Sequence, residues 1–216
     1  MALTCIYIAA ILFAFLSSLK SFRLDFPFHL KIFSILLGLT FLVELYSALI
    51  VRIVHVKNNY WIYNAFTLVE FWAYGYYYRQ LIRLDLFRKI ILFFLLLFPI
   101  FWLVTVCFVF GFNNWNSYVI VAGSFFTILF AVMYYYQVLL NREIQSLRNL
   151  PEFWIATGML IFYIGCLPYY GTLNFLWTFH KSAARTLWKV LLIMDTIMYV
   201  LFSYGYLCRT TNTKKS

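Results

Sequence analysis

The chain has 216 residues, of which 65% are hydrophobic and only 11% are charged, and its mean hydropathy is +0.85. Soluble globular proteins carry about 25% charged residues, so the composition excludes that class and indicates an integral membrane protein. The 17 Lys and Arg outnumber the 7 Asp and Glu, but they stand singly between apolar stretches and form no continuous face that would bind nucleic acid. We expect them to contact the anionic headgroups of the lipid bilayer, and we expect no nucleic-acid partner.

Seven stretches of the chain are long and apolar enough to cross the hydrocarbon of a bilayer, which takes about 20 residues. No Lys or Arg precedes the first stretch, unlike in a secretory signal peptide, so we expect it to remain as a helix. The connections are short, which predicts antiparallel neighbours in one bundle. The predicted fold is all-α, a polytopic seven-transmembrane-helix bundle that forms a single domain over residues 1–216. Its expected helices cover residues 3–19, 32–51, 60–82, 90–111, 118–140, 153–175 and 187–207.

The distribution of Lys and Arg predicts the orientation of this bundle, because cytoplasmic loops carry an excess of positive charge. Most of the 17 basic residues fall in the first, third and fifth loops and in the C-terminal tail. The fourth loop, residues 111–117, contains none. We therefore predict that the N-terminus lies outside and the C-terminus inside.

Three prolines give further information on the helices. Pro151 suits the first turn of a helix, where its missing N–H would have had no partner. Pro99 and Pro168 fall inside expected helices, and each removes a backbone hydrogen bond. We expect a bend at both positions, with neighbouring helices compensating for the lost bonds.

Three of the 7 acidic residues fall inside expected helices rather than in loops. Glu44, Glu70 and Asp195 each lie about twelve residues from the expected inner end of their helix, which at 1.5 Å per residue is a depth of about 18 Å. We therefore expect all three near the middle of the bilayer. The other acids fall in loops or at helix starts, where solvation by water explains them: Asp25, Asp85, Glu143 and Glu152.

These three acids define the candidate site. No Lys, Arg or His lies at their depth to pair with them. An unpaired carboxylate in hydrocarbon costs at least about 2.5 kcal/mol and usually takes up a proton instead. Because other polar side chains share the same helix faces, we predict a buried polar site for a proton, a cation or an amine-bearing ligand. Its candidate residues are Glu44, Glu70, Asp195, Asn64, Tyr74 and Tyr199. The alternative is structural: each acid is a protonated carboxyl that bonds across helices, at about 0.6 kcal/mol per bond, and holds the bundle in register.

The sequence contains no pattern of catalytic or metal-binding residues. His29, His55 and His180 fall in loops or at helix ends, whereas an intramembrane metal hydrolase needs histidines at one depth. The 4 cysteines lie in separate apolar segments without a C-x-x-C pair, which predicts neither a disulfide frame nor a zinc site. The motifs G-x-S-x-G and H-E-x-x-H are absent. We expect no enzyme activity, no catalytic residue, no metal and no cofactor.

Two segments and one acid carry a resemblance to a known family. Residues 151–171 read PEFWIATGMLIFYIGCLPYYG and residues 61–71 read WIYNAFTLVEF, with Glu44 before them. In these motifs the chain resembles an uncharacterised family of bacterial seven-helix integral membrane proteins, over most of its length. The resemblance implies a multi-pass protein of the bacterial inner (cytoplasmic) membrane, but no mechanism. At the level of the fold, the family also resembles the seven-helix sensing halves of membrane histidine kinases.

Two functions follow from these expectations. The first is a sensory or accessory membrane subunit, which would act through a membrane signalling partner. The second is a small transporter, which would use the mid-membrane acids to carry a proton, a cation or an amine solute. An intramembrane enzyme and a structural scaffold are the remaining alternatives.

Overall fold

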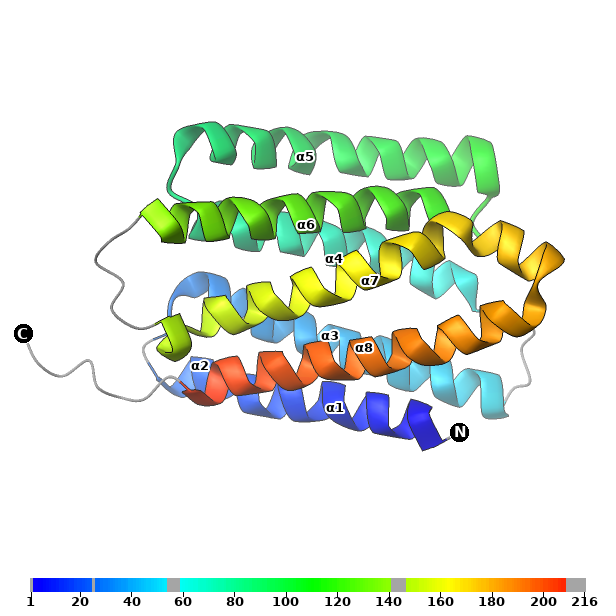
Figure 1. The fold of residues 1–216 in the computed structure, drawn as a ribbon, viewed down its shortest axis with the longest axis horizontal. Helices are drawn as coiled ribbons and strands as arrows, with labels where there is room; N and C mark the ends of the chain where they lie inside the picture. Colours follow the sequence, from blue (N-terminus) through cyan, green and yellow to red (C-terminus); the bar gives the residue numbers. More distant parts are fainter. Residues whose placement is uncertain (1, 25, 54–58, 141–146, 209–216) are drawn as a thin grey trace, which may run out of the picture.

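The computed structural model describes residues 2–24, 26–53, 59–140 and 147–208, and nearly all of them are helical. The long helices lie side by side and alternate in direction, so that α1 begins and α8 ends at opposite ends of the bundle (Figure 1). The predicted all-α fold is confirmed for these residues. The elements are α1 (Ala2–Ser18), α2 (Lys20–Arg23), α3 (Phe28–Ile53), α4 (Tyr60–Leu81), α5 (Asp85–Val104), the π-helical η1 (Thr105–Phe110), α6 (Ser117–Leu140), the short η2 (Leu147–Asn149), α7 (Pro151–Phe179) and α8 (Lys181–Cys208).

Among the described residues, 6 segments are long and apolar enough to cross a membrane. The one expected span that is not among these 6 is α4, the third in chain order, although it is long enough at 22 residues. It is less apolar than the others, because tyrosines, Asn64, Thr67 and Glu70 replace aliphatic residues along it. The structure therefore supports a multi-pass membrane protein with 6 candidate spans, where the sequence predicts seven. The candidate spans are Leu3–Arg23, Phe28–Ile50, Asp85–Phe110, Ser117–Leu140, Pro151–Leu173 and Lys181–Cys208.

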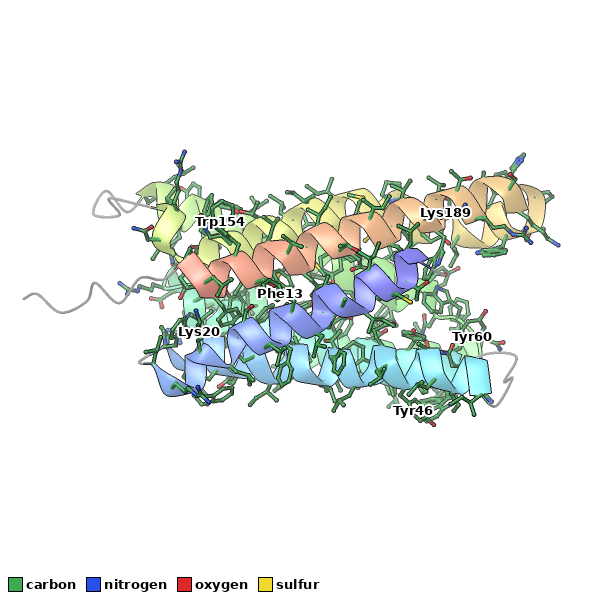
Figure 2. The ribbon with its side chains drawn as sticks, turned by 90° about the horizontal axis from the view of Figure 1, so that it is seen from below. Phe13, Lys20, Tyr46, Tyr60, Trp154 and Lys189 are labelled. Atoms are coloured by element: carbon green, nitrogen blue, oxygen red, sulfur yellow. The ribbon has the colours of Figure 1, made fainter. Side chains whose placement is uncertain are left out.

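Large apolar side chains cover much of the outer surface of the bundle. Phe13 of α1 and Tyr46 of α3 point away from it (Figure 2), and α5 exposes Leu96 and Ile100 in the same way. A soluble monomer rarely exposes apolar surface of this extent, whereas a helix surrounded by lipid requires it. The surface therefore agrees with the composition of the chain.

Helix α4 is the most enclosed element around the site. It packs against α3, α5 and α6, and it lies behind α6 in Figure 1. Asn64 and Tyr74 are buried. Val69 and Trp72 are exposed, whereas Ile62 is buried. Protein neighbours rather than lipid surround most of α4, which is why it can tolerate so many polar groups.

The hairpin of α7 and α8 is longer than the sequence predicts. The expected helices end at residue 175 and begin at residue 187, but α7 runs to Phe179 and α8 begins at Lys181, with only His180 between them. Hydropathy identifies only the part of a helix that lies in hydrocarbon. The first turns of α8 contain Ala, Leu, Lys and Arg, which favour a helix without being apolar enough on average to be recognised as a span. Helix α7, which contains a proline, also changes direction along its length (Figure 1).

The end of the bundle at which α7 begins is densely packed, and we call it the closed end. Tyr77, Tyr78 and Phe202 are fully buried there. The Tyr206 hydroxyl of α8 donates a hydrogen bond of 2.8 Å to the Leu30 carbonyl oxygen of α3. Interlocked rings leave little space between the helices at this end, although the buried Tyr77 hydroxyl and Arg79 Nε have no hydrogen-bond partner in the described chain.

A buried acid–histidine pair also lies at the closed end. His29 Nε2 is 2.9 Å from Glu152 Oε1, and the pair joins α3 to α7. The interpretation of Glu152 as a solvated residue is wrong, because it is only 8% exposed. The sequence predicts helix starts at residues 32 and 153, but α3 begins at Phe28 and α7 at Pro151. His29 and Glu152 therefore lie in the first turns of these two helices.

Candidate functional site

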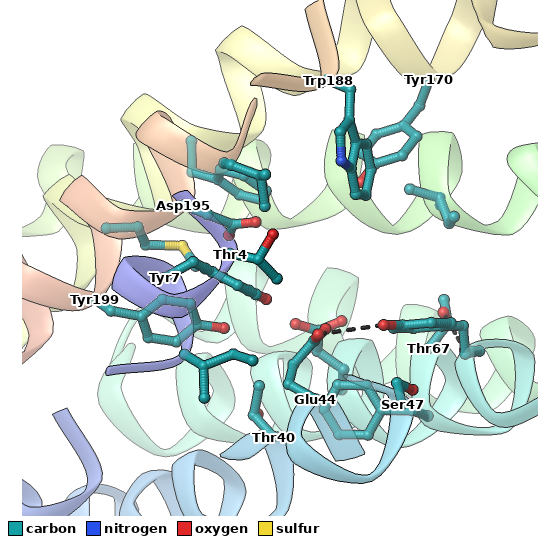
Figure 3. A pocket seen from close by; sticks show the side chains of 18 of the residues that line it. Thr4, Tyr7, Thr40, Glu44, Ser47, Thr67, Tyr170, Trp188, Asp195 and Tyr199 are labelled. Atoms are coloured by element: carbon teal, nitrogen blue, oxygen red, sulfur yellow. Dashed lines mark hydrogen bonds between the residues drawn. The ribbon is translucent and has the colours of Figure 1, made fainter. Parts of the chain in front are cut away.

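A cavity of about 610 Å³ lies between α1, α3, α4, α7 and α8, toward the end of the bundle at which α1 begins. Its volume is in the range of sites for small organic molecules. Glu44, Glu70 and Asp195, from three different helices, all line it. Figure 3 shows Glu44 and Asp195 on opposite walls, with both carboxylates directed into the space between them. The structure thus brings to one cavity the three acids that the sequence places at one depth.

Tyrosine hydroxyl groups orient two of the three carboxylates. Tyr63 OH donates a hydrogen bond of 3.2 Å to Glu44 Oε2, from α4 to α3. Tyr74 OH donates a hydrogen bond of 2.9 Å to Glu70 Oε1, one turn away on the same helix. A carboxylate has about four lone-pair sites, so both groups retain the capacity to accept hydrogen bonds from a ligand.

Asp195 is different from the two glutamates. It lines the same cavity and is partly exposed to it, but among the residues that the structure describes it has no hydrogen-bond or ion-pair partner. A carboxylate without a partner in the interior of a membrane bundle is costly to keep. Asp195 thus presents unused acceptor oxygens to the cavity.

Ser47 gives a second, independent indication of a ligand. Its side chain is only 3% exposed and lines the cavity beside Glu44 (Figure 3). Its hydroxyl makes no hydrogen bond of good geometry within the described ranges of the chain, and its polar neighbour is the hydroxyl of Tyr63. Leaving a buried polar group unpaired costs about 1–3 kcal/mol. Both the acid of α8 and the hydroxyl of α3 thus have hydrogen-bonding capacity that the protein itself does not use.

The negative groups of the cavity have no basic neighbour, because none of its lining residues is Lys, Arg or His. In the described part of the chain, no three His, Cys, Asp or Glu side chains are grouped so that they could hold a metal ion. The three acids come from three different helices, with Glu44 and Asp195 on opposite walls (Figure 3). They suit a larger ligand with positive charge at more than one point.

Aromatic side chains surround the mouth of the cavity. The Trp115 ring lies 5.7 Å from the ring of Tyr60, 6.1 Å from that of Tyr63 and 6.2 Å from that of Tyr170. Tyr60 and Trp188 also line the cavity and are exposed, so the cavity reaches the surface at this end. Glu70 lies about 15 Å farther along α4 than Tyr60, at 1.5 Å per residue. The site thus has an aromatic mouth and an acidic interior.

The remaining predicted site residues have different positions. Tyr199 lines the cavity. Tyr74 does not line it, but its hydroxyl bonds to Glu70, which does. Asn64 does not line it: its amide nitrogen donates hydrogen bonds of 2.8 Å to the carbonyl oxygens of Phe112 and Asn114, in the connection between η1 and α6. Six residues along an α-helix correspond to a rotation of about 240°, so Asn64 and the acid at position 70 face different neighbours.

Several lining residues were not predicted as part of a site. Thr4 and Tyr7 come from α1, and the Tyr7 ring lies 6.0 Å from the ring of Tyr199. The only sequence signal for them is two polar groups one turn apart in an otherwise apolar helix. Trp115 lies in the expected fourth loop, and the sequence does not show that this connection before α6 folds over the cavity.

Comparison of the chain with models of protein families, with curated proteins and with solved structures gives no match. The resemblance to a bacterial membrane family therefore stays a prediction. The geometry of the cavity alone carries the functional argument.

Proposed function

We propose that this protein is a small membrane transporter whose substrate, an organic cation, binds in the acidic cavity. The observation that carries the proposal is the convergence of Glu44, Glu70 and Asp195 on one cavity without any lining base. Ionisable residues inside a membrane bundle are expensive and commonly mark a solute or ion pathway. The first function expected from the sequence, a sensory or accessory subunit, uses the same binding step and is the second candidate.

The proposal includes seven spans, with α4 as the seventh. Its length of 22 residues is sufficient, and its neighbours α3, α5 and α6 shield its polar groups from lipid. Seven spans put the two termini on opposite sides of the membrane, and the distribution of basic residues favours the N-terminus outside. Location in the bacterial inner membrane rests on the family resemblance alone.

The direction of access follows from the packing at the two ends. The cavity reaches the surface where α1 begins, the outer side in this orientation. Between the acids and the closed end, the Phe33 ring lies 5.2 Å from the rings of Tyr77 and Phe202, and all three side chains are buried. This arrangement corresponds to an outward-facing state, and transport requires these rings to separate.

A sensory function is favoured by the same closed end. A receptor needs access to its ligand from one side only. Ligand binding shifts the arrangement of its helices, and a partner protein responds to that shift. The two functions therefore differ in whether the bound cation is released on the inner side.

The deciding experiment combines binding and flux on the full chain. Amines are titrated into the purified protein in detergent, and uptake of a bound, labelled amine is then measured in proteoliposomes. A transporter gives saturable uptake that Glu70→Gln abolishes, while Asp85→Asn, an exposed acid at the start of α5, leaves uptake unchanged. Binding without uptake would favour the sensory or accessory subunit, and the absence of amine binding would reject both functions at this site.

A further inference from the structure

The cavity contains three acids and no base among its lining residues. The acids come from α3, α4 and α8, and the carboxylates of Glu44 and Asp195 lie on opposite walls (Figure 3). A single ammonium group can be in contact with only one of such separated carboxylates. The others would then remain without a counter-charge in a bundle interior that weakly screens them.

We infer that the ligand is a linear di- or polyamine, in which ammonium groups are separated by short methylene chains. The inference rests on the proposed function and names the chemical class of its substrate. Such a ligand places one ammonium at Asp195 and another near Glu44 on the opposite wall (Figure 3). Three acids and no lining base match a ligand with two or three positive charges.

The hydrogen-bonding groups require a ligand that carries N–H donors. Asp195 has acceptor oxygens without a donor in the described chain, and the hydroxyl of Ser47, also unpartnered, can accept a further N–H. A primary ammonium has three N–H donors. A quaternary ammonium has none, so it would leave these groups unsatisfied.

The aromatic residues suit the rest of a polyamine. Methylene chains pack on ring faces, and an ammonium within about 6 Å of a ring centroid gains a cation–π interaction. Tyr60, Tyr63 and Trp115 form such a surface at the mouth, and Tyr7 and Tyr199 form one near Asp195. A flexible linear chain can follow the path from the mouth to the acids.

The test compares amines of matched chain length at constant ionic strength. Dissociation constants of 1-aminobutane, 1,4-diaminobutane and a linear triamine are measured by calorimetry on the full chain in detergent, with tetramethylammonium as the charge control. We expect the diamine to bind at least tenfold more tightly than the monoamine, and the triamine more tightly still. Tetramethylammonium should not compete with the diamine.

Two variants connect this preference to the acids. Asp195→Asn and Glu44→Gln should each reduce the ratio of monoamine to diamine dissociation constants to within about threefold of unity, while Asp85→Asn preserves it. Helical circular dichroism of each variant verifies that it is folded. Equal affinity for monoamine and diamine overturns the inference but leaves the proposed cation site standing. Failure of every amine to bind the folded protein overturns both.

Discussion

Removal of the Asp195 charge is the most informative single perturbation, because it should change binding and stability in opposite directions. The carboxylate has no partner in the described chain, so the ligand-free protein loses no interaction in Asp195→Asn. On insertion scales a charged side chain at the centre of a bilayer costs about 2.5–3.5 kcal/mol. We therefore expect the ligand-free variant to be as stable as the parent, or more stable by up to about 3.5 kcal/mol.

The effect on binding has the other sign. A hydrogen bond to a charged group contributes about 1.5–3 kcal/mol, and about 1.4 kcal/mol corresponds to a tenfold change in affinity. Asp195→Asn should therefore weaken the binding of a diamine by a factor of about 10 to 150. The amide still fills the same volume, so the loss reflects charge rather than shape.

Melting curves in detergent, with and without diamine, measure both effects on the same sample. The parent should melt at a higher temperature when the diamine is added, and the variant should show little or no shift. Asp85→Asn serves as the control, since this exposed acid lies at the start of α5 and does not line the cavity. If ligand-free Asp195→Asn is less stable than the parent by more than about 1 kcal/mol, the carboxyl is a structural group that bonds across helices, and the reasoning is refuted.

Three further substitutions test the packing around the site. His29→Ala removes one partner of the pair with Glu152 and should destabilise the protein by about 1.5–3 kcal/mol, without changing diamine affinity. An unchanged free energy of unfolding in denaturant would show that the pair does not stabilise the fold. Gly123→Ala adds a Cβ that overlaps the ring of Phe71, which lines the cavity, so we expect the protein to lose about 1–3 kcal/mol of stability and to bind the diamine more weakly. Gly171→Ala is the control, because Gly171 has open space around it and the substitution should be neutral in the same melting assay. Asn64→Asp sets a carboxylate against two carbonyl oxygens and should lower the melting temperature more than Asn64→Ala does; the reverse order would mean that the amide is not the donor.

The meeting of the three acids could be expected from the sequence, because equal position along the helices and inward facing each depend on one helix at a time. Hydropathy marks the spans, and a rise of 1.5 Å per residue converts position into depth. On that basis Glu44, Glu70 and Asp195 are expected at one level, and they do line one cavity.

What the sequence could not predict depends on how helices rotate and pair. Asn64 bonds to a connection that lies 48 and 50 residues farther along the chain, and the pairing of His29 with Glu152 spans 123 residues. Neither contact has a local signal. The extension of α7 and α8 was missed for another reason, since apolar content defines the part of a helix in hydrocarbon and not its true end.

Both ends of the bundle contain buried polar groups, and the two ends differ in what those groups face. At the closed end, His29 is paired with Glu152 and the Tyr206 hydroxyl bonds a backbone carbonyl, while the buried Tyr77 hydroxyl has no partner in the described chain but is packed among side chains. At the open end, Asp195 and the Ser47 hydroxyl face a cavity without partners in the described chain. Paired polar groups in a bundle hold helices together, whereas unpaired ones are a cost that folding alone does not offset. At the open end these unpaired groups face a space large enough for a ligand, which is what the proposed cation site requires.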